Sequence, residues 1–401
     1  MTPRLLRRRS RRIRAFAAAL VLAILPASAA SAQLPEPADP LVTERPDDWP
    51  QPAELEVEAA VLVEASSGQV LLEQQPDQRR PVASTIKVLT ALSVLERTDL
   101  DDEVTAGDEV LDVPGSGVDL QPGDTWTVEE LVDALISRSG NEAAEALAVH
   151  VAGDVDGFTD LMEQDAASIG VEGLELSSPS GLDDAQQLSA QDLATIARAA
   201  LDDDRLRPFL GRTSVTLPGV GSVPTRNELL DRYDGATGVK TGFTSAAGNS
   251  LVASAERDGR EVVAVVLGAG DDPARFDIAG ELLDLGLDDF STHQLSGQLR
   301  LAVGGGNVQL EVDPVEVSAP TGRDIGLDWP LTPRPPDEAP TVAITDGAAE
   351  GAAPLGSVPA RLDRDVAELD PDGAGGDALG RAVVDGVYAG LRAAAVTERL
   401  S

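Results

Sequence analysis

The chain has 401 residues, 42% of them hydrophobic and 3% aromatic, which allows a large core built from Ala, Val, Leu and Ile. Its formal net charge of −38 excludes a nucleic-acid partner, because phosphate backbones are bound through neutralising Lys and Arg side chains. Cysteine is absent, which excludes disulfides, thiolate nucleophiles and Cys-ligated metals.

Residues 1–32 have the features of an export signal. An arginine-rich start precedes an apolar run from Ala15 to Leu25, and Ala30-Ser31-Ala32 fits a small-residue cleavage site. The run is short for a membrane span of about 20 residues, so we expect cleavage after Ala32, with an uncleaved anchor as the alternative. The expected location is the cell envelope, on the periplasmic or extracellular side of the membrane. Residues 33–56 are rich in Pro and acidic residues and predict an exposed linker.

Residues 57–288 show the strand and helix patterns of one large α/β (α+β) domain. Two short apolar segments around Ser66-Ser67-Gly68 predict a hairpin, and two or three antiparallel strands are expected between Val239 and Leu267. Apolar residues at helical spacing predict the helices. These cover Ser84–Arg97, Val128–Ser137, Asn141–Val151, Ser189–Leu201 and Pro273–Leu285.

The character of the chain changes after residue 288. Residues 289–362 contain short apolar runs separated by Gly, Pro and Asp, which predicts a small β-rich domain. Residues 363–377 are acidic and Gly-rich and indicate a linker, and residues 378–401 have helical periodicity. This last helix lacks the basic face and bulky aromatics of membrane-surface helices, so a packed or solvated helix is favoured. Membrane association through it, or through an uncleaved signal, stays open.

Only two of the 31 basic residues are lysines, Lys87 and Lys240. Lys87 follows Ser84 by three positions at the start of a predicted helix, so both side chains lie on one helix face. A desolvated Lys87 could take the Ser84 proton and activate the hydroxyl as a nucleophile, which an always-charged arginine could not do. Taken alone, the pair is better explained as an N-cap serine and a surface lysine.

Two further triplets favour catalysis. Ser139-Gly140-Asn141 lies at a break between two predicted helices, and Lys240-Thr241-Gly242 lies in a predicted strand, where glycine would let a substrate backbone approach the strand edge. Each triplet alone has a structural explanation, as a capped helix break and a strand-edge turn. Together with Ser84 and Lys87, in this order and spacing, they indicate an active-site serine enzyme.

A histidine-dependent serine mechanism is not favoured. His150 falls in a predicted helix and is expected to be a packed helix residue, and His293 lies in a connection. Neither histidine accompanies a Gly-x-Ser-x-Gly turn. A metal site is not expected, because no second ligand stands beside His150 at metal-binding spacing.

The three motifs resemble those of the penicillin-recognising active-site serine enzymes, most closely the serine-type D-alanyl-D-alanine carboxypeptidases, or low-molecular-mass penicillin-binding proteins. The resemblance covers about Val57 to Leu287. Ser180 stands where many of these carboxypeptidases have His. The resemblance also includes Gln121-Pro122-Gly123-Asp124, the run Ser139–Ala144, Pro179-Ser180-Gly181-Leu182 and, most specifically, Gly238–Gly248.

This resemblance implies catalytic roles for three residues. Ser84 would attack the carbonyl between two terminal D-alanines, forming an acyl-enzyme that water then hydrolyses, and Lys87 would be the base. Ser139 would relay a proton toward the leaving amine. Asn141 would hydrogen-bond the substrate amide and steady Lys87.

The resemblance likewise implies how the substrate is held. Lys240 and Thr241, next to Gly242, would bind the terminal carboxylate, and the backbone amides of Ser84 and Phe243 would form the oxyanion hole. No metal or organic cofactor is implied. The implied partners are a peptidoglycan stem peptide ending in D-Ala-D-Ala and β-lactam antibiotics as inhibitors. The implied fold is β-lactamase/transpeptidase-like, with an all-helical subdomain beside the sheet.

Two alternatives remain at this point. A class A-like β-lactamase shares the serine, the lysine and the Lys-Thr-Gly strand, but the Glu-x-x-x-Asn arrangement expected of its deacylation loop is not visible between Gly153 and Gln187. A non-catalytic wall-binding protein could retain the same fold. The presence of every motif residue argues against that second alternative.

Overall fold

The computed structural model describes residues 45–52, 55–303, 306–323, 325–328, 341–346 and 354–362. The predicted export signal (1–32), the first part of the predicted linker, the acidic segment 363–377 and the predicted helix 378–401 lie outside these described residues. No helix in the described ranges is both long enough and apolar enough to cross a membrane.

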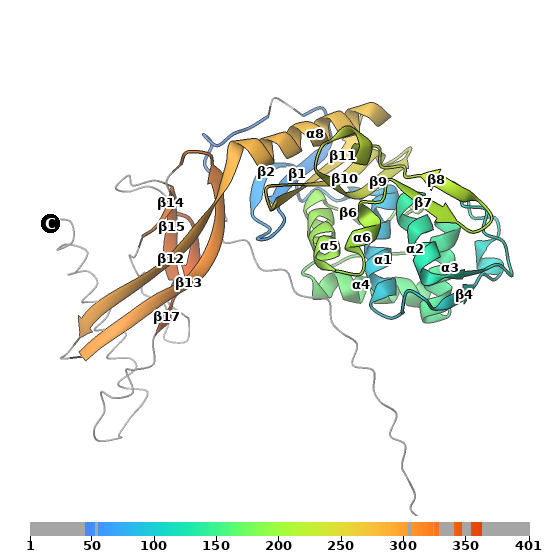
Figure 1. Ribbon diagram of the computed structural model, residues 1–401, viewed down its shortest axis with the longest axis horizontal. Coiled ribbons are helices and arrows are strands. Elements are labelled where there is room, and N and C mark those ends of the chain that lie inside the picture. The colour runs from blue at the N-terminus through green and yellow to red at the C-terminus, as the bar shows by residue number, and fades with distance from the viewer. Residues whose placement is uncertain are drawn as a thin grey trace, which may run out of the picture. The chain divides into compact units, whose positions relative to one another are not determined.

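The large domain is built on an antiparallel five-stranded sheet in the order β2-β1-β11-β10-β9 (Figure 1). The predicted antiparallel sheet flanked by helices is therefore confirmed. β9 lies at one edge of this sheet. The strands are β1 Ala59–Glu64, β2 Val70–Gln74, β9 Ala236–Thr244, β10 Gly248–Arg257 and β11 Arg260–Ala269.

The sheet separates two hydrophobic cores, because successive side chains of a strand point to opposite faces. In β1, Val61 and Val63 join the core that contains the helical subdomain, whereas Ala60 and Leu62 join the core beneath α8. The central strands are buried on both faces, which explains why their sequences are almost continuously apolar.

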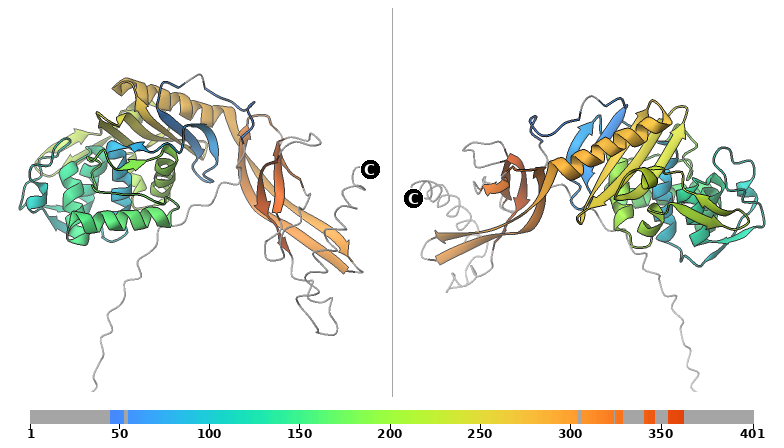
Figure 2. Two further views of the ribbon diagram at one scale, coloured as in Figure 1. Left: turned by 180° about the vertical axis from the view of Figure 1, so that it is seen from behind. Right: turned by 45° about the horizontal axis from the view of Figure 1, so that its top comes forward.

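Helices cover both faces of the sheet. Figures 1 and 2 show α8 across one face and α1 to α5 on the other. All five predicted helices are present, with small shifts at their ends. The helices are α1 Lys87–Leu95, α2 Val128–Ser137, α3 Asn141–Ala152, α4 Val155–Ser168, α5 Ala190–Asp202, α6 Arg207–Leu210, α7 Leu229–Arg232 and α8 Asp272–Asp289.

α4 was not predicted, although its start carries a local signal. Gly153 adopts a left-handed backbone with φ 88° and ends α3, and the Asp154 side chain then accepts from the Gly157 amide at 2.7 Å. α4 packs Phe158 and Met162 into the core. Acidic residues are interspersed among its few apolar residues, so the helical pattern in the sequence is weak.

Short strands and turns complete the described part of the large domain. β3 pairs with β6, β4 with β5, and β7 with β8. The bounds are β3 Arg80–Pro81, β4 Glu103–Thr105, β5 Thr125–Thr127, β6 Gln187–Leu188, β7 Ser214–Leu217 and β8 Gly221–Pro224, with 3₁₀ turns η1 Ala83–Ile86 and η2 Asp108–Val110.

The described residues after α8 are largely strands. β12 and β13 form a long antiparallel ribbon that also pairs with β17, and β14, β15 and β16 form a second sheet. The ribbon is longer than the short strands predicted there. The bounds are β12 Phe290–Val303, β13 Gly306–Pro320, β14 Ile325–Asp328, β15 Thr341–Asp346, β16 Pro354–Pro359 and β17 Arg361–Leu362.

Two predictions about exposure were wrong. Trp49 lies in the segment expected to be an exposed linker, yet it is 2% exposed and packs edge-to-face on Phe290 with ring centroids 5.6 Å apart. Leu55 is buried in the same cluster. The Pro-rich and acidic composition of the whole segment predicted exposure, although these two apolar residues are buried. His150, expected to be packed, is exposed on α3.

Candidate active site

Ser84 lies on a tight turn rather than at the start of an α-helix. It belongs to the 3₁₀ turn η1, and α1 begins three residues later at Lys87. Ala83 adopts a left-handed backbone with φ 49°, and the Thr85 hydroxyl donates to the Val82 carbonyl at 2.7 Å. The neighbours of Ser84 are buried while Ser84 itself is partly exposed. The turn therefore leaves Ser84 accessible while the residues on either side of it are buried.

Lys87 is fully buried directly behind that hydroxyl. Its Nζ donates to Ser84 Oγ at 2.9 Å, to Asn141 Oδ1 at 2.7 Å and to the carbonyl of Ser180. Burial lowers the pKa of Lys87 well below its ordinary value, and the positive charge of Lys240 lowers it further. Lys87 therefore loses its proton more readily than an exposed lysine does. The neutral amine would lie beside the Ser84 hydroxyl, from which it could take a proton.

Lys240 and Ser139 form a second contact in the same site. Ser139 has a left-handed backbone with φ 61° at the break between α2 and α3, and its Oγ accepts from Lys240 Nζ at 3.1 Å. Burial lowers the pKa of Lys240 to about 7, and the charges of Arg226 and Arg275 act in the same direction. Lys240 also donates to the carbonyl of Thr241 at 3.0 Å.

Two glycines of β9 lie very close to neighbouring segments of the protein. A Cβ on Gly242 would lie 2.9 Å from the Val82 carbonyl oxygen and 3.1 Å from a side-chain carbon of Thr85. A Cβ on Gly238 would lie 3.0 Å from Leu210 Cβ. Glycine at these positions thus lets the strand pack against η1 and α6, while the expected room for a substrate backbone stays a prediction. The close approach holds the Ser84 turn against β9.

Five of the predicted site residues make direct contacts, in two groups. Lys87 joins Ser84 to Asn141, and Lys240 contacts Ser139. The remaining predicted residues follow Lys240 along β9. Thr241 and Gly242 are next in the strand, and Phe243, whose amide was assigned to the oxyanion hole, has a side chain that is 62% exposed.

Sequence reasoning missed Arg226, which lies between β8 and α7. Its positive charge lowers the pKa of both Lys87 and Lys240, and its backbone amide donates to the Ser137 carbonyl at 2.9 Å, two residues before Ser139. Its side chain is exposed, and no carboxylate in the described part of the chain pairs with it. Nothing but its position in the fold distinguishes it from the other arginines of the sequence.

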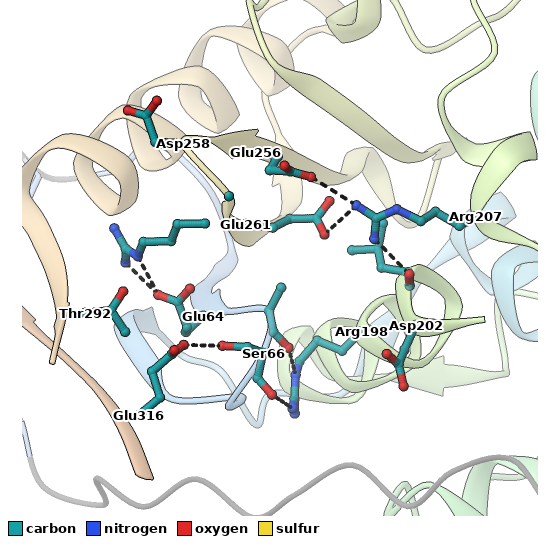
Figure 3. A pocket seen from close by; sticks show the side chains of 14 residues that line it. Glu64, Ser66, Arg198, Asp202, Arg207, Glu256, Asp258, Glu261, Thr292 and Glu316 are labelled. Atoms are coloured by element: carbon teal, nitrogen blue, oxygen red, sulfur yellow. Dashed lines mark hydrogen bonds and ion pairs between the residues drawn. The ribbon is translucent and has the colours of Figure 1, made fainter. Parts of the chain in front are cut away.

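A separate polar pocket of about 480 Å³ lies elsewhere in the molecule (Figure 3). None of the predicted site residues lines it. Its arginines are already engaged: Arg260 with Glu64, Arg207 with Glu261, and Arg198 with backbone carbonyls of the β1–β2 turn. This pocket is therefore not the site that contains the nucleophile.

Comparison with known proteins gives the relatives of this chain. It is 36% identical to D-alanyl-D-alanine carboxypeptidase DacB2 of Mycobacterium tuberculosis over 235 residues, covering 56% of this chain and 80% of that protein. It is 30% identical to D-alanyl-D-alanine carboxypeptidase DacF of Bacillus subtilis over 250 residues. That alignment covers 60% of this chain and 64% of DacF, which is slightly less than two thirds of its length.

Solved structures agree in fold. The D-alanyl-D-alanine carboxypeptidase of M. tuberculosis H37Rv superposes with a TM-score of 0.58 at 32% identity, covering 61% of this chain and 96% of that one. Penicillin binding protein 6B of Escherichia coli superposes with a TM-score of 0.66 at 28% identity, covering 79% and 99%. The second match extends beyond the large domain.

The family model described as D-alanyl-D-alanine carboxypeptidase, peptidase S11, matches residues 47–271, which is more than half of the chain. This range contains the Ser84 turn, the break at Ser139 and the lysine of β9. The chain belongs to the D-alanyl-D-alanine carboxypeptidase family, a family of serine peptidases.

Proposed function

We propose that this protein removes the terminal D-alanine from peptidoglycan stem peptides that end in D-Ala-D-Ala, through an acyl-enzyme on Ser84. The observation that carries this proposal is the buried Lys87 amine, which lies 2.9 Å from Ser84 Oγ. Because burial disfavours the ammonium form, Lys87 takes the Ser84 proton as the oxygen attacks the peptide carbonyl. The family membership of the chain supports the same reaction.

Departure of D-alanine requires a proton on its amine. Ser139 relays to that amine the proton that Lys87 took from Ser84, while its hydroxyl stays in contact with the Lys240 ammonium at 3.1 Å. Asn141 holds Lys87 in place through its Oδ1 atom. Its amide nitrogen donates one hydrogen to the Pro114 carbonyl at 2.7 Å, which leaves the second hydrogen of that nitrogen for a substrate carbonyl.

The terminal carboxylate binds at a cluster of positive charge. Lys240 and Arg226 supply the charge, and the Thr241 hydroxyl supplies a neutral donor beside them. The backbone amides of Ser84 and Phe243 stabilise the oxyanion. Binding an anion there raises the pKa of Lys240 again, which keeps Lys240 charged during the reaction.

The same groups accept β-lactam antibiotics, which carry a carboxylate and an acylating carbonyl, so penicillin forms a covalent adduct at Ser84. Hydrolysis of that adduct is slow, since the carboxylate motif of a class A β-lactamase was not found in the sequence. Rapid turnover of a fluorescent penicillin would contradict this and favour the β-lactamase alternative.

Export places the enzyme at its substrate. We assign residues 1–32 to a cleaved signal, 57–288 to the catalytic domain and 289–362 to the β-rich domain, with a linker at 363–377 and a C-terminal helix at 378–401. The proposed location is the cell envelope, on the periplasmic or extracellular side of the membrane. Mass spectrometry of the mature N-terminus from secreted material tests the cleavage after Ala32.

The central test uses a synthetic pentapeptide stem ending in D-Ala-D-Ala. The wild-type protein should release one D-alanine, detected as a single mass loss, and a fluorescent penicillin should label Ser84. Ser84→Ala should lose both activities while keeping the wild-type melting temperature. A stem that stays intact, together with unlabelled Ser84, would favour a non-catalytic wall-binding protein.

A further inference from the structure

Arg275, near the start of α8, is a buried cation that the catalytic steps above do not use. It is 7% exposed and still charged, because a guanidinium does not lose its proton in a protein. Burying a charge costs free energy, and a buried ion pair is seldom a net gain in stability. The burial of Arg275 is thus explained better by the groups that it holds in place than by stability alone.

The Arg275 guanidinium joins α8 to the strands β9 and β10. Its Nη1 atom donates to the Gly242 carbonyl of β9 at 3.1 Å and to the Ser250 carbonyl of β10 at 3.4 Å. Its Nη2 atom pairs with the Asp272 carboxylate, and the group lies 4.8 Å from the centroid of the Phe276 ring. The planar guanidinium is therefore fixed by an acid and a ring of α8 while it binds the backbone of the sheet.

The Gly242 carbonyl belongs to the same peptide unit as the Phe243 amide. That peptide bond is trans and planar, so the carbonyl and the amide point in opposite directions. Gly242 and Ser250 are register partners, and one nitrogen of Arg275 reaches both of their carbonyls, so the Gly242 carbonyl points toward β10. The Phe243 amide consequently points away from β10, at the edge of the sheet that β9 forms.

β9 approaches the nucleophile turn at this same peptide unit. A Cβ on Gly242 would lie 3.2 Å from the backbone nitrogen of Thr85, which directly follows Ser84. A tilt of the peptide plane would therefore move the Phe243 amide relative to the Ser84 hydroxyl. Hydrogen bonds weaken steeply when their distance or angle departs from the preferred geometry, so the orientation of this plane matters for any oxygen bound there.

We propose that Arg275 is a positioning residue for the oxyanion hole: it holds the Gly242 carbonyl so that the Phe243 amide of the same peptide unit faces the reacting carbonyl oxygen. This proposal rests on the proposed function, in which the amides of Ser84 and Phe243 stabilise the oxyanion. A cation on the carbonyl also polarises the peptide unit, which makes its N–H a stronger donor. In this role Arg275 acts through the peptide unit and does not touch the substrate.

The effect of Arg275 should fall on the chemical step, because the oxyanion develops only as the acyl bond forms. Arg275→Met removes the cation and keeps a long side chain, and the largely exposed Asp272 stays hydrated. We expect the rate constant of Ser84 acylation at saturating penicillin to fall about tenfold to hundredfold, since one oxyanion donor is misplaced. The dissociation constant of the initial noncovalent complex should change by less than about twofold.

Stopped-flow measurements with a fluorescent penicillin at several concentrations separate these two constants. Arg232→Met is the matched control, because the Arg232 guanidinium also lies near the Phe276 ring, 5.0 Å from its centroid, and pairs with Glu228. It should keep both wild-type constants. Wild-type acylation in Arg275→Met, a change in its dissociation constant alone, or an equal loss in both variants would overturn the proposal.

Infrared spectroscopy gives a second readout, which reports on the oxyanion hole itself. The acyl carbonyl of the penicillin adduct, labelled with a heavy carbon isotope, absorbs at lower wavenumber when it accepts strong hydrogen bonds. Its band should lie at higher wavenumber in Arg275→Met than in the wild-type protein. A band at the wild-type position would contradict a role in placing the Phe243 amide.

If Arg275→Met does not fold, Arg275→Lys carries the same test. A lysine keeps the charge but lacks the planar fork that pairs with Asp272 and reaches both carbonyls at once. This variant should show slower acylation and the same direction of band shift, and wild-type values for both would overturn the proposal. Failure of the proposed function looks different, since the wild-type protein would then form no adduct at Ser84.

Discussion

The positive charge of Lys240 lowers the pKa of Lys87, and only burial has a larger effect on the Lys87 amine. The two lysines come from α1 and β9, which are 153 positions apart in the sequence but share one site. Because neither side chain has a carboxylate within hydrogen-bond distance among the described residues, each amine is easier to deprotonate than an exposed lysine.

Lys87→Arg should abolish acylation of Ser84, with a loss of at least about a thousandfold in rate. A guanidinium cannot accept a proton, and it is larger than the buried amine that it replaces. The rate of penicillin labelling, followed by mass spectrometry of the intact protein, measures the effect. Circular dichroism serves as the control for folding, and a folded variant with near wild-type labelling would refute the role of Lys87 as the base.

Arg226→Ala should raise KM for the pentapeptide more than it lowers kcat. Arg226 is an exposed residue with no salt bridge to a carboxylate among the described residues, so the substitution removes charge for the carboxylate without disturbing the core. We expect a tenfold to hundredfold loss in kcat/KM, about 1.4 to 3 kcal/mol of transition-state binding. Arg232→Ala, at an exposed arginine paired with Glu228, is the control and should behave like wild type. Equal kinetics for both variants would remove Arg226 from the site.

Gly242→Ala should displace the Ser84 turn. The new methyl group would lie 2.9 Å from the Val82 carbonyl oxygen, which is closer than a real contact permits. We expect destabilisation of about 1–3 kcal/mol and at least a tenfold slower acylation. Gly270→Ala is the matched control, because a Cβ there has no atom within 4 Å. Thermal unfolding and penicillin labelling give the two readouts; a stable, fully active Gly242→Ala protein would show that the contact with η1 is unimportant.

Stability should rise with pH because of Lys240. Its pKa is lowered from 10.5 to about 7 by burial, so between these values the unfolded chain holds a proton that the folded chain has released. The free energy of unfolding therefore gains up to about 1.4 kcal/mol per pH unit from this group. In Lys240→Met the gain disappears. Urea unfolding at about pH 7.5 and 9.5 compares the two proteins, and parallel changes with pH would contradict the assignment.

Much of the fold was predictable because its signals are local. The predicted start and end of α2 are those of the structure, since Thr127 and Glu130 form a capping box at its start. β10 and β11 were predictable from their apolar runs. The segment around Trp49 was not, since its burial depends on Phe290, far away in the sequence.

The sequence by itself determined the chemistry that this protein can perform. Ser84, Lys87 and the triplets at Ser139 and Lys240 are recognisable because a reaction needs particular functional groups in a particular order. Only the tertiary structure decided which further residues join them. Arg226 belongs to no motif, and its charge affects Lys87 and Lys240 only because the folded chain brings these separate segments together.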